Sequence, residues 1–272
     1  MQTERELKRE LVKICRMLHL KNFIAATDGN VSVKYGSRLL TTPSGVNKGF
    51  IEEDQIIGVD LAGRVVSGRG QPTSELAMHL MVYEVRPDVR AVIHAHPPLA
   101  TAFSIAGVTL EEFVLPEVVM TMGGIPTTSY ATPTTPDVPE VIRELIQRYD
   151  ALILARHGGL TLGRDLMDAY NKMEKLEHTA LVILTARQLG EVRLLPLTEV
   201  EKLTQMGGGK GLRAQEVVSP AFPGLALPGN PEAGPGPAVD LERIVELIKE
   251  EVARHLALGE APSPPSEPEP LL

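Results

Sequence analysis

The sequence lacks the features that would place it in a membrane or outside the cell. Its 272 residues include one cysteine, Cys15, so no disulfide can form within the chain. No apolar run approaches the roughly 18 to 20 residues that a membrane span needs. The opening residues MQTERELKRE also lack the apolar core of a signal peptide. We therefore expect a cytoplasmic protein with no membrane partner.

The chain also has fewer positively than negatively charged residues. The chain has 27 Lys and Arg against 35 Asp and Glu, which gives a formal net charge of -8. This acidic balance disfavours binding to a phosphate backbone, so we expect no nucleic-acid partner. A dinucleotide-binding fold is disfavoured as well, because no predicted strand is followed by a G-x-G-x-x-G turn.

Composition divides the chain into four segments. Residues 1–206 alternate apolar segments with turns, as a packed domain does. Residues 207–238 hold 8 Gly and 6 Pro in 32 residues, which predicts a flexible linker. Residues 239–258 have apolar side chains at three- and four-residue spacing, which predicts an amphipathic helix with Asp240 as its N-cap. Residues 259–272 are expected to be disordered.

Within the first segment the hydrophobic periodicity alternates between helix and strand. Helices are predicted from Thr3 onwards, where Thr3 and Glu6 can form a capping box, and over 74–85, 137–149 and 165–189. Strands are predicted over 30–34, 38–42, 55–60, 64–68, 89–94 and 151–155. The third and fourth strands are joined through LAG, which indicates a hairpin. The sequence thus predicts an α/β domain with an antiparallel hairpin in its sheet.

Two histidines stand at the end of the apolar run in AVIHAHPPLA, residues 91–100. Successive side chains of a strand point to opposite faces, so His94 and His96 project from the same face. Pro97 and Pro98 cannot continue the hydrogen-bond ladder, which leaves both histidines at the carboxyl end of the strand, where α/β folds usually place ligands. The pair suits either a metal ion or two hydrogen-bonded histidines at a strand terminus.

A third histidine has a similar setting. His157, in ALILARHGGLTLG, follows an apolar strand and precedes a glycine, whose conformational freedom lets backbone approach a ligand closely. Three neutral imidazoles with an open position are a recurrent pattern of catalytic divalent-metal sites. The other histidines lie within predicted helices and are expected to be packed or surface residues rather than ligands: His19, His79, His178 and His255.

The segment GQPTSELAMH offers a base. Thr73 or Ser74 can cap the helix predicted there, which places Glu75 in the first turn, near the positive end of the helix dipole. Such a glutamate is also an ordinary feature of helix N-termini.

Two glycine-containing turns, ATDGNVSV and TTPSGVNKG, supply donors for an anion. The residues concerned are Thr27, Gly29, Asn30, Ser44 and Gly45. Together with Thr73 and Ser74 at a helix N-terminus, they predict a site for one phosphate.

Six motifs carry a family resemblance: DGNVSVK, TPSGV, QPTSELAMHLMVY, VRAVIHAHPPLATAFS, PTTSYATPTT and ARHGGLTLG. In this order and at these intervals they resemble the class II aldolase family typified by L-fuculose-1-phosphate aldolase, over roughly residues 5–190. The resemblance implies a three-layer α/β/α domain around a mostly antiparallel or mixed sheet, followed here by a flexible C-terminal extension.

The resemblance also implies a site and a reaction. A divalent ion, zinc or else manganese or cobalt, would be held by His94, His96 and His157, with Glu75 as fourth ligand and as acid/base. The substrate phosphate would bind Thr27, Asn30, Ser44, Gly45, Thr73 and Ser74. A tyrosine contributed across a subunit interface, here Tyr130, would act on the aldehyde oxygen in a cyclic homotetramer. The implied reaction cleaves a ketose 1-phosphate to dihydroxyacetone phosphate and a small aldehyde such as lactaldehyde.

Other activities within the family stay open. Relatives epimerise pentulose phosphates, dehydrate methylthioribulose phosphate or decarboxylate small acids. Glu75 favours aldol cleavage over epimerisation, because the epimerases that resemble this sequence usually carry Asp there. A non-catalytic interaction module like the adducin head is less well supported, because all three histidines are present. Two positions depart from the family pattern: Asp28 adds a carboxylate beside the phosphate site, and Arg156 stands where many relatives have Asn.

The C-terminal extension resembles the encapsulation peptides that carry enzymes into bacterial microcompartments. A helix of about 18 residues is too short to be stable alone and must bury its apolar stripe against a partner. The stripe consists of Leu241, Ile244, Val245, Ile248, Val252 and Leu256. Its partner is expected to be either a microcompartment shell protein or the tetramer of the protein itself.

Overall fold

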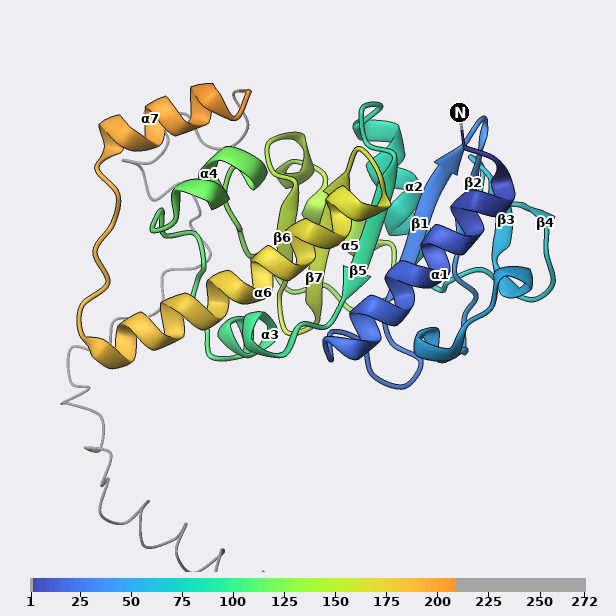
Figure 1. The fold of residues 1–272 in the computed structure, drawn as a ribbon, viewed down its shortest axis with the longest axis horizontal. Coiled ribbons are helices and arrows are strands. Elements are labelled where there is room, and N and C mark those ends of the chain that lie inside the picture. The colour runs from blue at the N-terminus through green and yellow to red at the C-terminus, as the bar shows by residue number, and fades with distance from the viewer. Residues whose placement is uncertain (1, 209–272) are drawn as a thin grey trace, which may run out of the picture. The chain divides into compact units, whose positions relative to one another are not determined.

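The computed structural model describes residues 2–208, which fold around one seven-stranded sheet (Figure 1). The strands are β1 (Asn30–Tyr35), β2 (Arg38–Thr41), β3 (Ile57–Asp60), β4 (Val65–Ser67), β5 (Ala91–Ala95), β6 (Ala151–Leu154) and β7 (Gly158–Gly163). Their order across the sheet is β4-β3-β2-β1-β5-β7-β6, and each neighbouring pair is antiparallel. In the part of the chain that is described, no helix has both the length and the apolar character to cross a membrane.

Helices cover both faces of this sheet, which gives three layers (Figure 1). The helices are α1 (Glu4–Leu20), α2 (Leu76–Val85), α3 (Pro98–Ile105), α4 (Pro116–Met122), α5 (Asp137–Ile142), α6 (Leu166–Leu189) and α7 (Leu197–Met206). Helices α1, α3, α4 and α6 pack on one face of the sheet, and α2 and α5 pack on the other. The predicted α/β/α architecture with an antiparallel sheet is confirmed.

The first helix begins as the sequence predicts. Thr3 Oγ1 accepts a hydrogen bond from the Glu6 backbone N–H, and Glu6 Oε2 accepts one from the Thr3 N–H at 2.7 Å, so the capping box is complete. The apolar face of α1 is buried against β1 and β5. This packing holds the loop after α1, which leads into the glycine turn at Gly29.

Side-chain alternation in β1 and β5 decides which residues reach the α2 side of the sheet. Ile93 packs with the α1 layer and Val92 with the α2 layer, so His94 follows Val92 to the α2 side. In β1, Asn30 pairs directly with His94 across the sheet. The sheet register therefore places polar side chains of two neighbouring strands under the first residues of α2.

Strand β7 is hard to recognise in the sequence because it begins with two glycines. A Cβ at Gly158 would lie 2.3 Å from the Ala95 carbonyl oxygen, and one at Gly159 would lie 3.1 Å from Met173 Sδ. The backbone of β7 therefore passes close to β5, where a side chain at Gly158 would clash with the Ala95 carbonyl, and close to the Met173 side chain of α6. As a result the strand reads as a loop in the sequence, although all six of its residues are buried.

Several predicted boundaries need correction. The strands predicted over 55–60 and 89–94 begin only at Ile57 and Ala91. The helix predicted over 137–149 ends at Ile142 and is followed by a separate 3-10 turn, η3 (Leu145–Gln147). The helix predicted over 74–85 begins only at Leu76. The short helices α3, α4 and α7 were not predicted; Pro98 and Pro116, which end a strand or loop pattern in the sequence, serve as first residues of α3 and α4.

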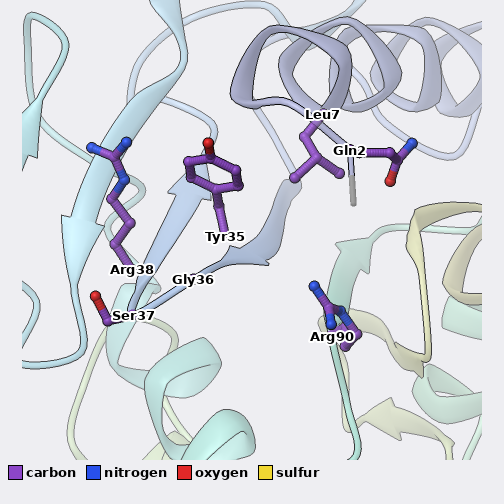
Figure 2. Close-up of a pocket in the computed structure, with 7 residues that line it drawn as sticks. All are labelled: Gln2, Leu7, Tyr35, Gly36, Ser37, Arg38 and Arg90. Carbon is purple, nitrogen blue, oxygen red and sulfur yellow. The ribbon is translucent and has the colours of Figure 1, made fainter.

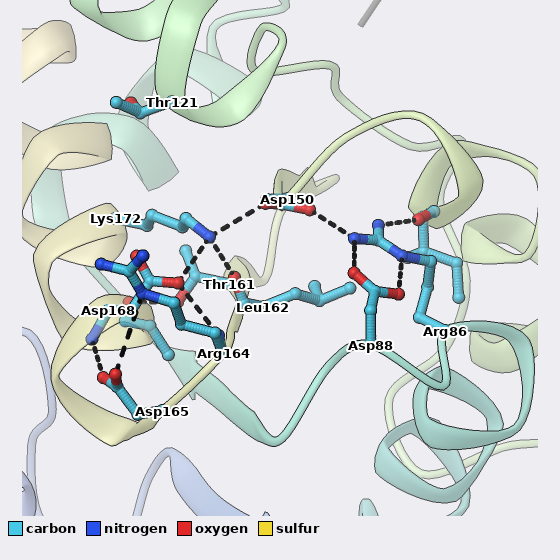
Figure 3. Close-up of polar contacts among 12 residues, drawn as sticks. Arg86, Asp88, Thr121, Asp150, Thr161, Leu162, Arg164, Asp165, Asp168 and Lys172 are labelled. Atoms are coloured by element: carbon cyan, nitrogen blue, oxygen red, sulfur yellow. Dashed lines mark hydrogen bonds and ion pairs between the residues drawn. The ribbon is translucent and has the colours of Figure 1, made fainter. Parts of the chain in front are cut away.

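A network of ion pairs lies at the end of the sheet where strands β5 and β6 begin (Figure 3). Asp150, just before β6, accepts hydrogen bonds from Arg86 at 2.9 Å and from Lys172 of α6 at 2.9 Å. Lys172 also donates to Asp168 at 3.0 Å, and Arg86 pairs with Asp88. These paired charges join α2, α6 and β6 at the edge opposite His94.

The C-terminal predictions are not tested by this structure. Apart from residues 207 and 208, the predicted linker over 207–238, the helix over 239–258 and the tail over 259–272 lie outside the described residues.

Candidate active site

Three histidines meet where β5 and β6 end. The ligand atoms of His94, His96 and His157 all lie within 4.8 Å of one another, and the Nε2 atoms of His94 and His96 are 3.0 Å apart. His94 and His96 come from the end of β5, and His157 comes from the tight turn between β6 and β7. The structure thus brings together the three histidines predicted as metal ligands.

Local hydrogen bonding turns the same ring nitrogen of each strand histidine towards the cluster. His94 Nδ1 donates to the Gly159 carbonyl oxygen at 2.9 Å, which leaves the Nε2 lone pair facing the other rings. His96 Nδ1 faces Asp28 Oδ2 at 3.5 Å. Burial lowers the pKa of all three imidazoles, to about 4 for His96. The rings are therefore neutral at pH 7, the form that binds metals.

Glu75 completes the cluster from the start of α2. Its Oε2 lies 3.3 Å from His94 Nε2, and its Oε1 lies 3.8 Å from His157 Nε2. Oε1 is buried and has no hydrogen-bond partner among the described residues. Burial alone would raise the pKa of Glu75, but the His94 imidazole and a hydrogen bond from Asn30 outweigh it and hold the pKa below its ordinary value. A buried carboxylate oxygen beside three neutral imidazoles suits a divalent cation.

The position of Glu75 differs from the prediction in one respect. Glu75 occupies the N-cap position, just before the first turn of α2, with φ at -101°. Its backbone N–H donates to Thr73 Oγ1 at 3.3 Å, and its side chain makes no capping bond. The predicted capping of the helix by Thr73 or Ser74 is therefore wrong, because the N-cap position is taken by Glu75, whose side chain is turned to the histidines.

A buried chain of hydrogen bonds leads from the core to Glu75. Asn30 Nδ2 donates to Glu75 Oε2 at 2.8 Å, and His79 Nε2 donates to Asn30 Oδ1 at 2.6 Å. His79 Nδ1 then accepts from Ser32 Oγ at 2.6 Å, and Ser32 also contacts the Tyr83 hydroxyl at 2.8 Å. His79 is packed in the helix as predicted, but it also orients Asn30, a role that the sequence did not indicate.

One cleft of about 290 Å³ is lined by Glu75 and two of the three histidines together with the predicted phosphate residues. Its walls include Thr27, Asn30, Ser44, Gly45, Thr73 and Ser74, together with Glu75, His96 and His157. The Asn30 amide is already used by Glu75 and His79, so its side chain serves the base in this structure. The cleft is also lined by Lys48, which the sequence analysis did not predict. Its position three residues after Gly45, beside a predicted phosphate turn, could have indicated it.

Tyr130 does not reach the cleft of its own chain. Its side chain is 60% exposed, and it is not among the residues that line the cleft. Pro133 and Thr134 of the same loop do line it, so the loop borders the cleft while Tyr130 faces outwards.

Strained backbone gathers around the cleft. Ala26, Thr134 and Arg156 have φ values of 45°, 67° and 60°, which are unfavourable for residues with a side chain. Each adjoins or is a cleft residue, since Ala26 precedes Thr27 and Arg156 precedes His157. Arg156 is exposed, and its backbone N–H donates to Ser104 Oγ at 3.0 Å. Asn tolerates this left-handed conformation better than Arg does.

A second hollow, at the edge of the sheet opposite His94, offers no comparable chemistry (Figure 2). Arg38 in its wall is paired with Glu4, and its guanidinium lies 5.2 Å from the centre of the Tyr35 ring. The other two described helix histidines, His19 and His178, lie on α1 and α6 and do not line the cleft. His255 lies outside the described residues.

Comparison with known proteins identifies the family. Residues 9–184 match the model of the Class II Aldolase and Adducin N-terminal domain. Because this match spans most of the chain, the chain belongs to that family. Relatives that carry an aldolase name support the predicted enzyme class, a lyase of the class II aldolase family.

Two relatives and one solved structure illustrate the range of activities named among similar proteins. The chain is 37% identical over 171 residues to L-fuculose phosphate aldolase of Methanococcus maripaludis, which covers 63% of this chain and 92% of that protein. It is 31% identical over 201 residues to 3-oxo-tetronate 4-phosphate decarboxylase of Pectobacterium atrosepticum. That alignment covers 72% of this chain and 90% of that protein. A solved structure of L-fuculose 1-phosphate aldolase superposes with a TM-score of 0.69 at 30% sequence identity. The superposition covers 74% of this chain and 95% of that one.

Proposed function

We propose that this protein cleaves a ketose 1-phosphate, such as L-fuculose 1-phosphate, to dihydroxyacetone phosphate and a small aldehyde such as lactaldehyde. The observation that carries the proposal is a cleft that Glu75, His96 and His157 line together with the polar turns at Gly45 and Ser74, with His94 buried in the same histidine cluster. Aldol cleavage needs both parts, because the bond that breaks lies close to the phosphate of the substrate.

Four side chains are suited to hold a divalent ion, with Zn²⁺ as first candidate and Mn²⁺ or Co²⁺ as alternatives. The proposed ligands are His94, His96, His157 and Glu75. The neutral imidazoles and the unpartnered Glu75 Oε1 fit such an ion. When bound, it would act as a Lewis acid for the charge that develops on the substrate oxygens during bond cleavage.

Glu75 is the proposed acid/base. Cleavage of the C3–C4 bond leaves C3 in need of a proton. Glu75, having taken up a proton from solvent, would deliver it to C3 and return to the carboxylate; in the reverse direction the carboxylate would remove the same proton from dihydroxyacetone phosphate. The hydrogen bond from Asn30 and the support from His79 hold Glu75 Oε2 in place, so that Oε1 is the oxygen left without a hydrogen-bond partner among the described residues. Thr73, Ser74, Thr27, Ser44 and the backbone at Gly45 would bind the phosphate at the other end.

Tyr130 is proposed to take the proton from the C4 hydroxyl, whose oxygen becomes the aldehyde oxygen, in the cleft of a neighbouring subunit. Its outward position in its own chain supports a role in another subunit of a cyclic homotetramer. Mixing inactive Glu75→Gln and Tyr130→Phe subunits tests this idea. Random equal mixing should restore about a quarter of full activity, since a site regains both groups when one subunit of each kind meets in the right order. Mixed tetramers with no activity would contradict it.

The reaction is tested with a panel of ketose 1-phosphates. Release of dihydroxyacetone phosphate is measured with and without a chelator, and metal is then restored to the chelated protein. Activity that survives complete removal of the metal, or a Glu75→Gln variant with full turnover, would contradict the scheme.

Decarboxylation of a 3-oxo-tetronate 4-phosphate is the second candidate, because relatives with that name align with 70–75% of the chain. The same proposed metal and phosphate residues would serve that substrate. An adducin-like interaction module is disfavoured, because the histidine cluster and Glu75 are in place.

Compartment and assembly are part of the same proposal. We propose a cytoplasmic enzyme, and the helix predicted over 239–258 would either bind a microcompartment shell protein or dock on the tetramer. Fusion of residues 239–258 to a fluorescent protein, expressed with shell proteins, separates the two. Diffuse fluorescence beside well-formed shells would contradict shell targeting.

A further inference from the structure

A buried lysine that the proposed chemistry does not use lies in the wall of the cleft. Lys48 is the first residue of a short 3-10 turn, η1 (Lys48–Phe50), in which Asn47 Oδ1 accepts a hydrogen bond from the Gly49 N–H at 2.9 Å. A Cβ at Gly49 would lie 2.4 Å from His19 Cγ, so the turn packs tightly against α1. The backbone that carries Lys48 is thus rigid, and only 3% of the residue is exposed.

The ammonium group lacks a counter-charge. It donates to the Thr27 carbonyl oxygen, and within residues 2–208 no carboxylate is close enough to form an ion pair with it. Burial lowers the pKa of Lys48, while Cys15, Asp28 and Glu75 act in the opposite direction. An ammonium group has three donors, so donors remain for a ligand. A buried cation without a partner is unfavourable, which favours an anion in the cleft.

The carboxylate of Asp28 is directed elsewhere. Asp28 lines the same cleft, but its Oδ2 lies 3.5 Å from His96 Nδ1, on the metal side. The donors at the phosphate side, the turns at Gly45 and Ser74 and the Thr73 hydroxyl, are neutral. They can orient a phosphate but cannot balance its two negative charges. In a chain with a net charge of -8, a local cation is needed to hold a dianion against the overall field.

We propose that Lys48 determines substrate specificity by pairing with the phosphate group, so that the cleft selects phosphorylated ketoses over unphosphorylated ones. This rests on the proposed function in its choice of substrate, but the anion site itself does not depend on which bond is cleaved. The alternative role for Lys48 is purely structural: its bond to Thr27 would fix the loop before Gly29.

The test compares Lys48→Met with the native full-length protein. Binding of inorganic phosphate is measured by calorimetry in the presence of a chelator, so that phosphate cannot bind an ion at the histidines. Loss of a charge-assisted bond should weaken phosphate binding about 10- to 100-fold. The KM for a phosphorylated ketose should rise by a similar factor, while kcat changes little. Lys48→Arg, which keeps the charge, should recover part of the affinity.

Lys34→Met is the matched control, because Lys34 is a half-buried lysine outside the cleft, 3.5 Å from the Tyr83 carbonyl oxygen. It should leave phosphate binding unchanged. Native-like phosphate binding by Lys48→Met, or a Lys48→Arg variant no better than Lys48→Met, would overturn the inference. Equal weakening of metal and phosphate binding by Lys48→Met would assign Lys48 the structural role instead. If phosphate binds through Lys48 but no ketose phosphate is cleaved, the proposed reaction fails and the anion site stands.

Discussion

His79 should make the stability of this protein sensitive to acid. The imidazole is fully buried between Ser32 and Asn30, and burial lowers its pKa from 6.5 to about 3. In the unfolded chain the same side chain keeps its ordinary pKa. Between the two values the unfolded state binds a proton that the folded state does not. The contribution of His79 to stability is therefore present above pH 6.5 and is lost as the pH falls towards 3.

The size of the effect follows from the pKa difference. Each pH unit in this window changes the free energy of unfolding by about 1.4 kcal/mol for one histidine. At pH 5, one and a half units below the ordinary pKa of 6.5 and still well above the folded one, the loss from His79 is about 2 kcal/mol. This is a large part of the ~5 to 15 kcal/mol that stabilises a typical domain.

The assay is urea unfolding at pH 7 and pH 5, at one protein concentration and with a chelator. His79→Gln keeps a donor for Asn30 but does not titrate. It should be less stable at pH 7 by about 1 to 3 kcal/mol, because the bond from Ser32 is lost. Its further loss on going to pH 5 should be about 2 kcal/mol smaller than that of the native protein. His178→Gln, at an exposed site on α6, is the control. Equal acid losses in native protein and His79→Gln would refute the reasoning.

Three further substitutions test the site and its surroundings. Glu75→Gln should lower turnover about 10²- to 10⁴-fold while the protein stays folded, as measured by single-turnover kinetics and circular dichroism. Asp28→Asn should weaken zinc binding about 10-fold, measured by competition with a chromophoric chelator, because the partner of His96 Nδ1 is altered; unchanged affinity would leave Asp28 without this role. Arg156→Asn should raise the free energy of unfolding by about 0.5 to 1 kcal/mol, because Asn tolerates the left-handed backbone; a destabilised variant would show that the Arg156 side chain is needed.

The histidines of the site could be predicted from the sequence because they lie at strand ends. The spacing of His94 and His96 fixes a shared face, and the prolines after them fix the end of the strand. The face is chosen by the neighbours: Val92 packs under α2, so both histidines turn towards the start of that helix. Local pattern and long-range packing agree here, which is why the histidine cluster could be predicted.

Other parts depend on contacts that no local pattern records. Strand β7 needs glycines because Ala95 and Met173 approach it closely, and those neighbours are distant in sequence. His79 looks like any helix histidine until the sheet brings Asn30 and Ser32 to its two nitrogens. Both cases show a residue whose role is assigned by a partner from another element.

The choice between aldol cleavage and decarboxylation depends on the leaving fragment. Both reactions break a carbon–carbon bond next to a carbonyl group, and the histidines and Glu75 would serve either one. Aldol cleavage must also remove the proton from the hydroxyl that becomes the aldehyde oxygen, whereas loss of CO₂ from a carboxylate requires no such transfer. If Tyr130 performs that transfer, Tyr130→Phe should lower dihydroxyacetone phosphate release about 10²-fold or more. Release of CO₂ from 3-oxo-tetronate 4-phosphate, where it occurs, should be nearly unchanged. A parallel fall of both activities would instead assign Tyr130 to the shape of the loop that carries Pro133 and Thr134 into the cleft.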